Sequence, residues 1–165
     1  MNIDTFRQMY VTELQELYSV ETQLTEALPK MLDTARRVEL KQVIRDHLQE
    51  TRSQRDRLEE LLRRHKAAPH EHVDQSMEAI VREADKWAEM IEDTDLRDAG
   101  LIACAQRVEH YEIAIYGTLA TWADQLGLHE DLFILHAILD EEKRADEKLT
   151  AIAKLVVNRE TVAAA

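Results

Sequence analysis

Four acidic residues interrupt apolar helical stripes in this sequence, and carboxylates at such positions could bind metal ions. They are Glu21, Glu50, either Glu109 or Glu112, and Glu142. A buried carboxylate costs several kcal/mol of folding free energy unless a cation or hydrogen bonds compensate it. Each acid stands near the middle of its stripe, so antiparallel packing would bring all four to the same height. This coincidence predicts a cation site and disfavours the plainer interpretation, in which the acids border the buried face and reach solvent.

The two halves of the sequence repeat this arrangement. A separation of 29 residues lies between Glu21 and Glu50, and one of 30 residues between Glu112 and Glu142. Superposing the halves pairs Glu50 with Glu142, Gln54 with Asp146, and Tyr18 with Glu109. A pseudo-twofold centre of this kind predicts similar ligand sets for two metal ions, with Glu50 and Glu142 placed to bridge or chelate them.

The donor set indicates which metals would bind. Carboxylates with at most one imidazole favour iron or manganese over zinc. Many carboxylate-bridged bundles carry Glu-x-x-His on two helices, but Ser53 and Ala145 stand where those histidines are expected. The alternative ligands, one turn from an acid of the second or fourth stripe, are His47, Gln54 and Asp146.

Tyrosines and the single cysteine are expected to have supporting roles. Hydrogen bonds to the ligating carboxylates are predicted from Tyr18, Tyr111 and Tyr116. Cys104 is the only cysteine, so neither an intramolecular disulfide nor a rubredoxin-like module can form within the chain, and its thiol is expected to pack.

Long amphipathic segments must position these side chains. Apolar residues recur at steps of three and four over 3–31, 40–61, 101–126 and 132–156, with a shorter segment over 73–94. Pro29 is expected to kink or end the first helix one turn before its stripe ends. Thr94 and Asp95 are the expected N-caps of the third long helix, and Gly127 is its expected stop. The pattern predicts two helical hairpins joined by a crossover helix.

Composition and charge define the broad class of protein. Three glycines and two prolines in 165 residues favour an all-α fold, with one domain over 1–157 and a disordered tail over 158–165. The charged fraction of 33% leaves no membrane-spanning run. A formal charge of −12 argues against nucleic-acid binding. No basic and apolar leader stands at the N-terminus, so a cytoplasmic location is expected.

Several segments resemble the YciF-type ferritin-like family of bacterial stress proteins. They are AQRVEHYEIA at 105–114, YGTL at 116–119, YSVETQL at 18–24, HLQET at 47–51 and EEKRADEKLT at 141–150. The resemblance covers nearly the whole chain and implies a ferritin-like antiparallel four-helix bundle. The metal positions it implies are Glu21, Glu50, Glu109, Glu112 and Glu142, followed by Asp146, His47 and Gln54.

These observations lead to two hypotheses for function. In the first, two metal ions, iron or manganese, serve the oxidation of Fe(II) or an unknown donor by O2 or peroxide during stress. In the second, the bundle binds metal or partner helices without catalysis and acts by storage or assembly. Trp and Tyr side chains on secondary faces of the helices favour a homodimer under either hypothesis.

Overall fold

The computed structural model describes residues 2–154, and all their regular secondary structure is helical. The helices are α1 (Phe6–Thr34), α2 (Val38–Arg64), α3 (Gln75–Met90), α4 (Thr94–Gln125) and α5 (His129–Ile152). The all-α prediction is therefore confirmed for this part of the chain. The tail predicted over 158–165, and the last residues of the predicted domain, lie outside the described residues.

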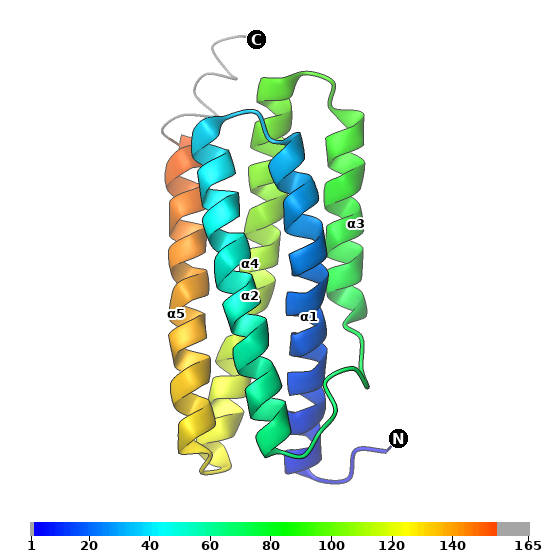
Figure 1. The fold of residues 1–165 in the computed structure, drawn as a ribbon, viewed down its shortest axis with the longest axis vertical. Helices are drawn as coiled ribbons and strands as arrows, with labels where there is room; N and C mark the ends of the chain where they lie inside the picture. Colours follow the sequence, from blue (N-terminus) through cyan, green and yellow to red (C-terminus); the bar gives the residue numbers. More distant parts are fainter. Residues whose placement is uncertain (1, 155–165) are drawn as a thin grey trace.

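The four long helices run side by side, and α3 lies along one side of them (Figure 1). Short turns join α1 to α2 and α4 to α5, and the most extensive helix packing occurs within these two pairs. The helix α3 carries the chain from the end of α2 back to the start of α4, packing on α4 and α1. The crossover helix predicted between residues 73 and 94 is thus present.

The observed helix ends can be compared with those predicted from the sequence at three positions. Asp93, not Thr94 or Asp95, caps α4, because its Oδ1 accepts from the backbone N–H groups of Asp95 at 3.0 Å and Leu96 at 2.8 Å. Pro29 lies inside α1, which continues to Thr34, so of the two predicted effects it does not end the helix. Met31 and Leu32, beyond the proline, still pack against the core. Gly127, with a φ of +69°, ends α4 as predicted.

The core runs along the axis between the long helices and is apolar at both ends and polar in the middle. Leucines and two fully buried tyrosines, Tyr10 and Tyr116, fill most of it. The buried acids of the middle are Glu21, Glu109, Glu112 and Glu142. Within the described residues, no helix is long and apolar enough to cross a membrane.

Candidate metal centre

Four side chains from three helices converge in the middle of the core. His47 from α2, Glu109 and Glu112 from α4, and Glu142 from α5 each offer one ligand atom, and these atoms all lie within 4.8 Å of one another. We call these residues the central cluster. All four are buried, with exposed fractions of 5% or less. The i, i+3 spacing on α4 places Glu109 and Glu112 on the same helix face.

The remaining long helix, α1, contributes Glu21 to the same part of the core. Its side chain is fully buried, and it accepts a short hydrogen bond from the Tyr116 hydroxyl. Glu142 and Glu112 are near enough to influence its pKa. Each of the four long helices therefore contributes at least one buried ionisable side chain at this height.

Many buried polar atoms here lack a hydrogen-bond partner among the described residues. Buried oxygen and nitrogen atoms are nearly always paired in folded proteins. With the carboxylates ionised, the unpaired ones are Glu21 Oε2, both ring nitrogens of His47, Gln54 Oε1, Glu109 Oε2, both carboxylate oxygens of Glu112, and Glu142 Oε2. A proton shared between Glu21 and Glu112, or between Glu109 and Glu142, would pair some of these oxygens. The nearest approach between His47 and Glu109, 3.4 Å, is long for a hydrogen bond. Because all these atoms are potential metal donors, the residues fit a bound cation.

Burial shapes the protonation of the cluster. It raises the pKa values of Glu21, Glu109 and Glu112 well above the usual range, with the neighbouring acids adding to the effect. For Glu142, burial raises the pKa to about 7. Burial, followed by the charge of Lys148, lowers the pKa of His47 to about 4. The imidazole is therefore neutral at neutral pH, which is its ligand form, whereas burial shifts the acids toward their protonated forms, so a cation would compete with protons for them.

Comparison of the two halves corrects the predicted superposition of α2 on α5. Buried residues recur at a constant offset of 91, as from Ile44 to Leu135 and from Leu58 to Leu149. The same offset relates Glu21 to Glu112 and Tyr18 to Glu109. On α2 and α5 it pairs Thr51 with Glu142 and Gln54 with Ala145, not Glu50 with Glu142. The repeat is real, but its α2 copy carries no carboxylate at the fully buried position.

Thr51 therefore stands where symmetry would place an acid. Its hydroxyl donates to the His47 carbonyl oxygen at 2.9 Å, within its own helix. The α2 helix instead supplies His47 and Gln54 to the core. The Gln54 amide nitrogen donates to Glu142 in a short hydrogen bond and lies 3.1 Å from Glu141. Gln54 is thus placed to orient Glu142.

Glu50 lies at the edge of the cluster. Its side chain is 34% exposed, and its Oε2 is 4.0 Å from His47 Nδ1. It faces a solvent-open polar groove between α2 and α5, which Asp46, Arg57, Glu141, Arg144 and Lys148 also line. Glu141, which is not among the predicted site residues, pairs with Arg57 across the groove at 3.1 Å. The acidic doublet at 141–142 was the available signal.

The remaining predicted site residues make contacts with other partners, although the charge of Asp146 still acts on the pKa of Glu109. Asp146 accepts from the Gln106 amide at 3.2 Å and lies 3.3 Å from His110. The Tyr111 hydroxyl donates to Asp74, the N-cap of α3, at 2.6 Å. Tyr18 packs edge-on against His70. Of the three tyrosines, Tyr116 donates a hydrogen bond to an acid of the core, Glu21.

Known proteins resemble this chain along nearly its whole length. A family described as a domain of unknown function (DUF892) matches residues 5–162. Protein YciF of Escherichia coli K12 is 40% identical over 160 residues, covering 96% of both chains. The crystal structure of the E. coli stress protein YciF has a TM-score of 0.87, with 39% identity over 92% of this chain and 96% of that one.

Two further solved structures share the architecture. YcfI of Rhodopseudomonas palustris, a proposed structural protein, has a TM-score of 0.89 and 38% identity, covering 92% of this chain and 97% of that one. A Xanthomonas campestris protein has a TM-score of 0.76 and 22% identity, covering 95% of this chain and 99% of that one. At this identity the likeness shows a shared fold only.

Proposed function

The chain belongs to the DUF892 family, and we propose that it is a ferritin-like four-helix bundle whose core binds two metal ions and oxidises Fe(II) with O2 or peroxide. The observation that carries the proposal is the convergence of unpaired, buried donor atoms from all four long helices. Such an arrangement lowers the stability of the folded protein unless a cation compensates it, so metal binding should stabilise the fold. The stress-protein description of the E. coli relative supports a role in stress.

We assign the ligands from burial and proximity. The proposed set is Glu21, His47, Glu109, Glu112 and Glu142, with Gln54 and Glu50 as further donors. Four carboxylates offer more oxygens than a single ion uses, which favours two ions. Glu50 is reached from the polar groove, so it is placed to pass an incoming cation to His47. Asp146 is not in the set, because Gln106 and His110 are its partners.

The chain's own residues would hold and orient the substrate ions and keep bulk water out. Bound Fe(II) supplies the electrons for the reduction of the oxidant. Tyr116 fixes Glu21, and Gln54 fixes Glu142, through their hydrogen bonds. The leucines above and below the cluster exclude water. Manganese(II) suits the same oxygen-rich donor set, and with it bound the bundle would be a manganese protein.

Anaerobic loading followed by rapid mixing with oxidant tests the proposal. We expect two Fe(II) per chain, followed by the absorbance rise of ferric iron after addition of O2 or peroxide. Glu112→Gln and Glu21→Gln should lose both signals with helix content intact. Glu147→Gln, an exposed acid of α5, is the matched control and should behave as the wild type. Oxidation that is no faster than for iron in buffer would contradict the proposal.

A non-catalytic role is the second possibility, and the description of the R. palustris relative as a proposed structural protein favours it. The same experiment separates the two. Binding of two ions per chain without accelerated oxidation indicates passive binding or assembly. Uptake far above two irons per chain indicates storage of mineral.

We also propose a homodimer in the cytoplasm. Exposed apolar side chains that a partner subunit would cover include Trp87, Met90, Leu96 and Phe133. Light scattering coupled to size exclusion measures the oligomeric state, and a monomer at all concentrations would contradict this part of the proposal.

A further inference from the structure

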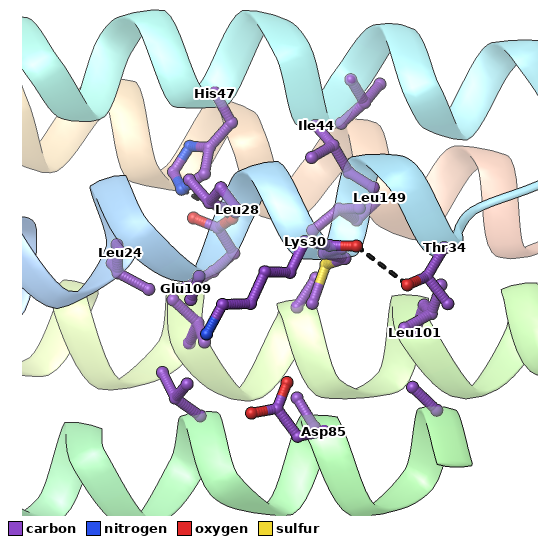
Figure 2. A pocket seen from close by; sticks show the side chains of 18 residues that line it. Leu24, Leu28, Lys30, Thr34, Ile44, His47, Asp85, Leu101, Glu109 and Leu149 are labelled. Atoms are coloured by element: carbon purple, nitrogen blue, oxygen red, sulfur yellow. Dashed lines mark hydrogen bonds and ion pairs between the residues drawn. The ribbon is translucent and has the colours of Figure 1, made fainter.

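A small apolar cavity lies directly beside the central cluster. It has a volume of about 50 Å3 and is enclosed by α1, α2, α3, α4 and one residue of α5. Its inner end is formed by His47 and Glu109, two members of the cluster (Figure 2). Exposed Lys30 of α1 and Asp85 of α3 form its outer end. The cavity thus extends from the surface between α1 and α3 to the centre.

The wall between these two ends is almost entirely aliphatic. It is made of residues such as Leu24, Leu28, Val81, Ala84, Leu101 and Val108. Apolar cavities of this kind stay dry and take up apolar atoms or small molecules. A cation or a hydrogen-bonding molecule would have to give up its hydration to pass between these side chains, because they offer no compensating partners.

We propose that this cavity is the route by which dioxygen reaches the centre, so that O2 is the oxidant the fold is built to admit. The inference rests on the proposed function of the site. Two Fe(II) ions each give one electron to O2, which takes two protons that arrive by the polar groove at Glu50 and leaves by that groove as hydrogen peroxide, with two Fe(III) remaining. Dioxygen is apolar and diatomic, so it needs no hydrogen bonds along the wall.

The small volume and the apolar wall of the cavity disfavour organic ligands and peroxide as occupants. Drug-sized organic ligands occupy pockets of roughly 300–1,000 Å3, several times the 50 Å3 found here. Peroxide both donates and accepts hydrogen bonds, and burying such groups without partners is unfavourable. The charged groove between α2 and α5 suits peroxide and cations better, because Glu50 and Glu141 line it in contact with solvent. The two reactants would therefore enter from different sides of the bundle.

Narrowing the cavity from α3 provides the test, because α3 contributes none of the proposed ligands. Ala84 is buried and lines the cavity, so Ala84→Leu fills part of it. Ala79 is exposed on the same helix, and Ala79→Leu is the matched control.

Rates of Fe(II) oxidation are measured by rapid mixing with O2 and, separately, with peroxide, after anaerobic loading and a check of iron stoichiometry. We expect Ala84→Leu to slow the O2 reaction several-fold while leaving iron content and the peroxide reaction unchanged. Ala79→Leu should match the wild type in all three.

Each outcome has a distinct meaning. Equal O2 rates in Ala84→Leu and Ala79→Leu, with two irons bound, would overturn the route but leave the proposed function intact. Absence of iron binding or oxidation in the wild type would instead overturn the proposed function. If Ala84→Leu does not fold, xenon-pressurised crystals of the wild type decide the matter, because xenon should bind in the cavity beside His47. A cavity without xenon would refute the route.

Discussion

Without metal, the protein should become less stable as the pH rises from about 6.5 to about 8, which is opposite to the usual behaviour of carboxylates paired with cations. The perturbation is removal of metal with a chelator. The cause is the burial that raises the pKa of every acid in the central cluster, including Glu142 to about 7. In the unfolded chain these acids ionise near their ordinary values.

The sign follows from proton binding. Between the ordinary pKa of 4.5 and about 7 for Glu142, the folded state holds a proton that the unfolded state releases, so rising pH favours unfolding. At about 1.4 kcal/mol per pKa unit, this group alone corresponds to a loss of about 3 kcal/mol. That is a large part of a typical domain's stability of about 5–15 kcal/mol. Glu21, Glu109 and Glu112 act in the same direction and extend the loss to higher pH. His47 opposes it below about pH 6.5, because burial lowers its pKa from 6.5 to about 4 and the unfolded state then binds the extra proton. The net loss is therefore expected above about pH 6.5.

Metal should reverse this trend. A cation binds the ionised carboxylates, so its affinity rises with pH as the competing protons leave. Saturation at a hundred times the Kd adds about 2.7 kcal/mol. With Mn(II) present, stability should therefore hold or rise over the range in which the metal-free protein weakens.

Urea unfolding followed by circular dichroism at four pH values between about 6.5 and 8 measures the effect. Glu142→Gln should reduce the loss in the chelated protein, and the exposed control Glu147→Gln should not. A metal-free wild type whose stability is constant or increases over this range would refute the reasoning that the acids are buried without a compensating charge.

Other substitutions test separate parts of the structure. Glu112→Gln should abolish metal binding, whereas Asp146→Asn should retain it, because Asp146 pairs with Gln106 and His110. Elemental analysis measures the metal content of both variants, and equal losses of metal would contradict the ligand assignment. Tyr10→Phe removes a buried 2.9 Å hydrogen bond to Asp131, away from the central cluster. The substitution should lower the free energy of unfolding in urea by about 1 kcal/mol and leave the metal content unchanged. No change in stability would show that the bond contributes nothing.

The helices and most of the acids could be predicted from the sequence because both depend on a local period. Spacing of three and four residues located the four long helices, and Glu21, Glu109, Glu112 and Glu142 are all buried. Helix ends were less predictable, because neighbouring acids compete as caps. Asp93 caps α4 although Thr94 and Asp95 offer similar side chains.

The pairing of Glu50 with Glu142 differs from the observed offset because successive helical residues point about 100° apart. A shift of one position turns Glu50 toward solvent and Thr51 into the core, and both residues fit a loosely drawn stripe. The sequence held a signal that could have resolved this. Matching apolar positions, such as Ile44 with Leu135 and Leu58 with Leu149, fixes the offset between the halves at 91 and brings His47 inward with Ile138. The apolar cavity depends on packing among five helices and has no such local signal.

Anomalous diffraction from crystals loaded anaerobically with Fe(II) tests the central claim most directly. Data at the iron absorption edge locate the ions without reference to activity. We expect two anomalous peaks per chain in the core, in contact with His47, Glu109, Glu112 and Glu142 and with Glu21. Peaks confined to surface carboxylates, with none between these side chains at saturating Fe(II), would contradict the account.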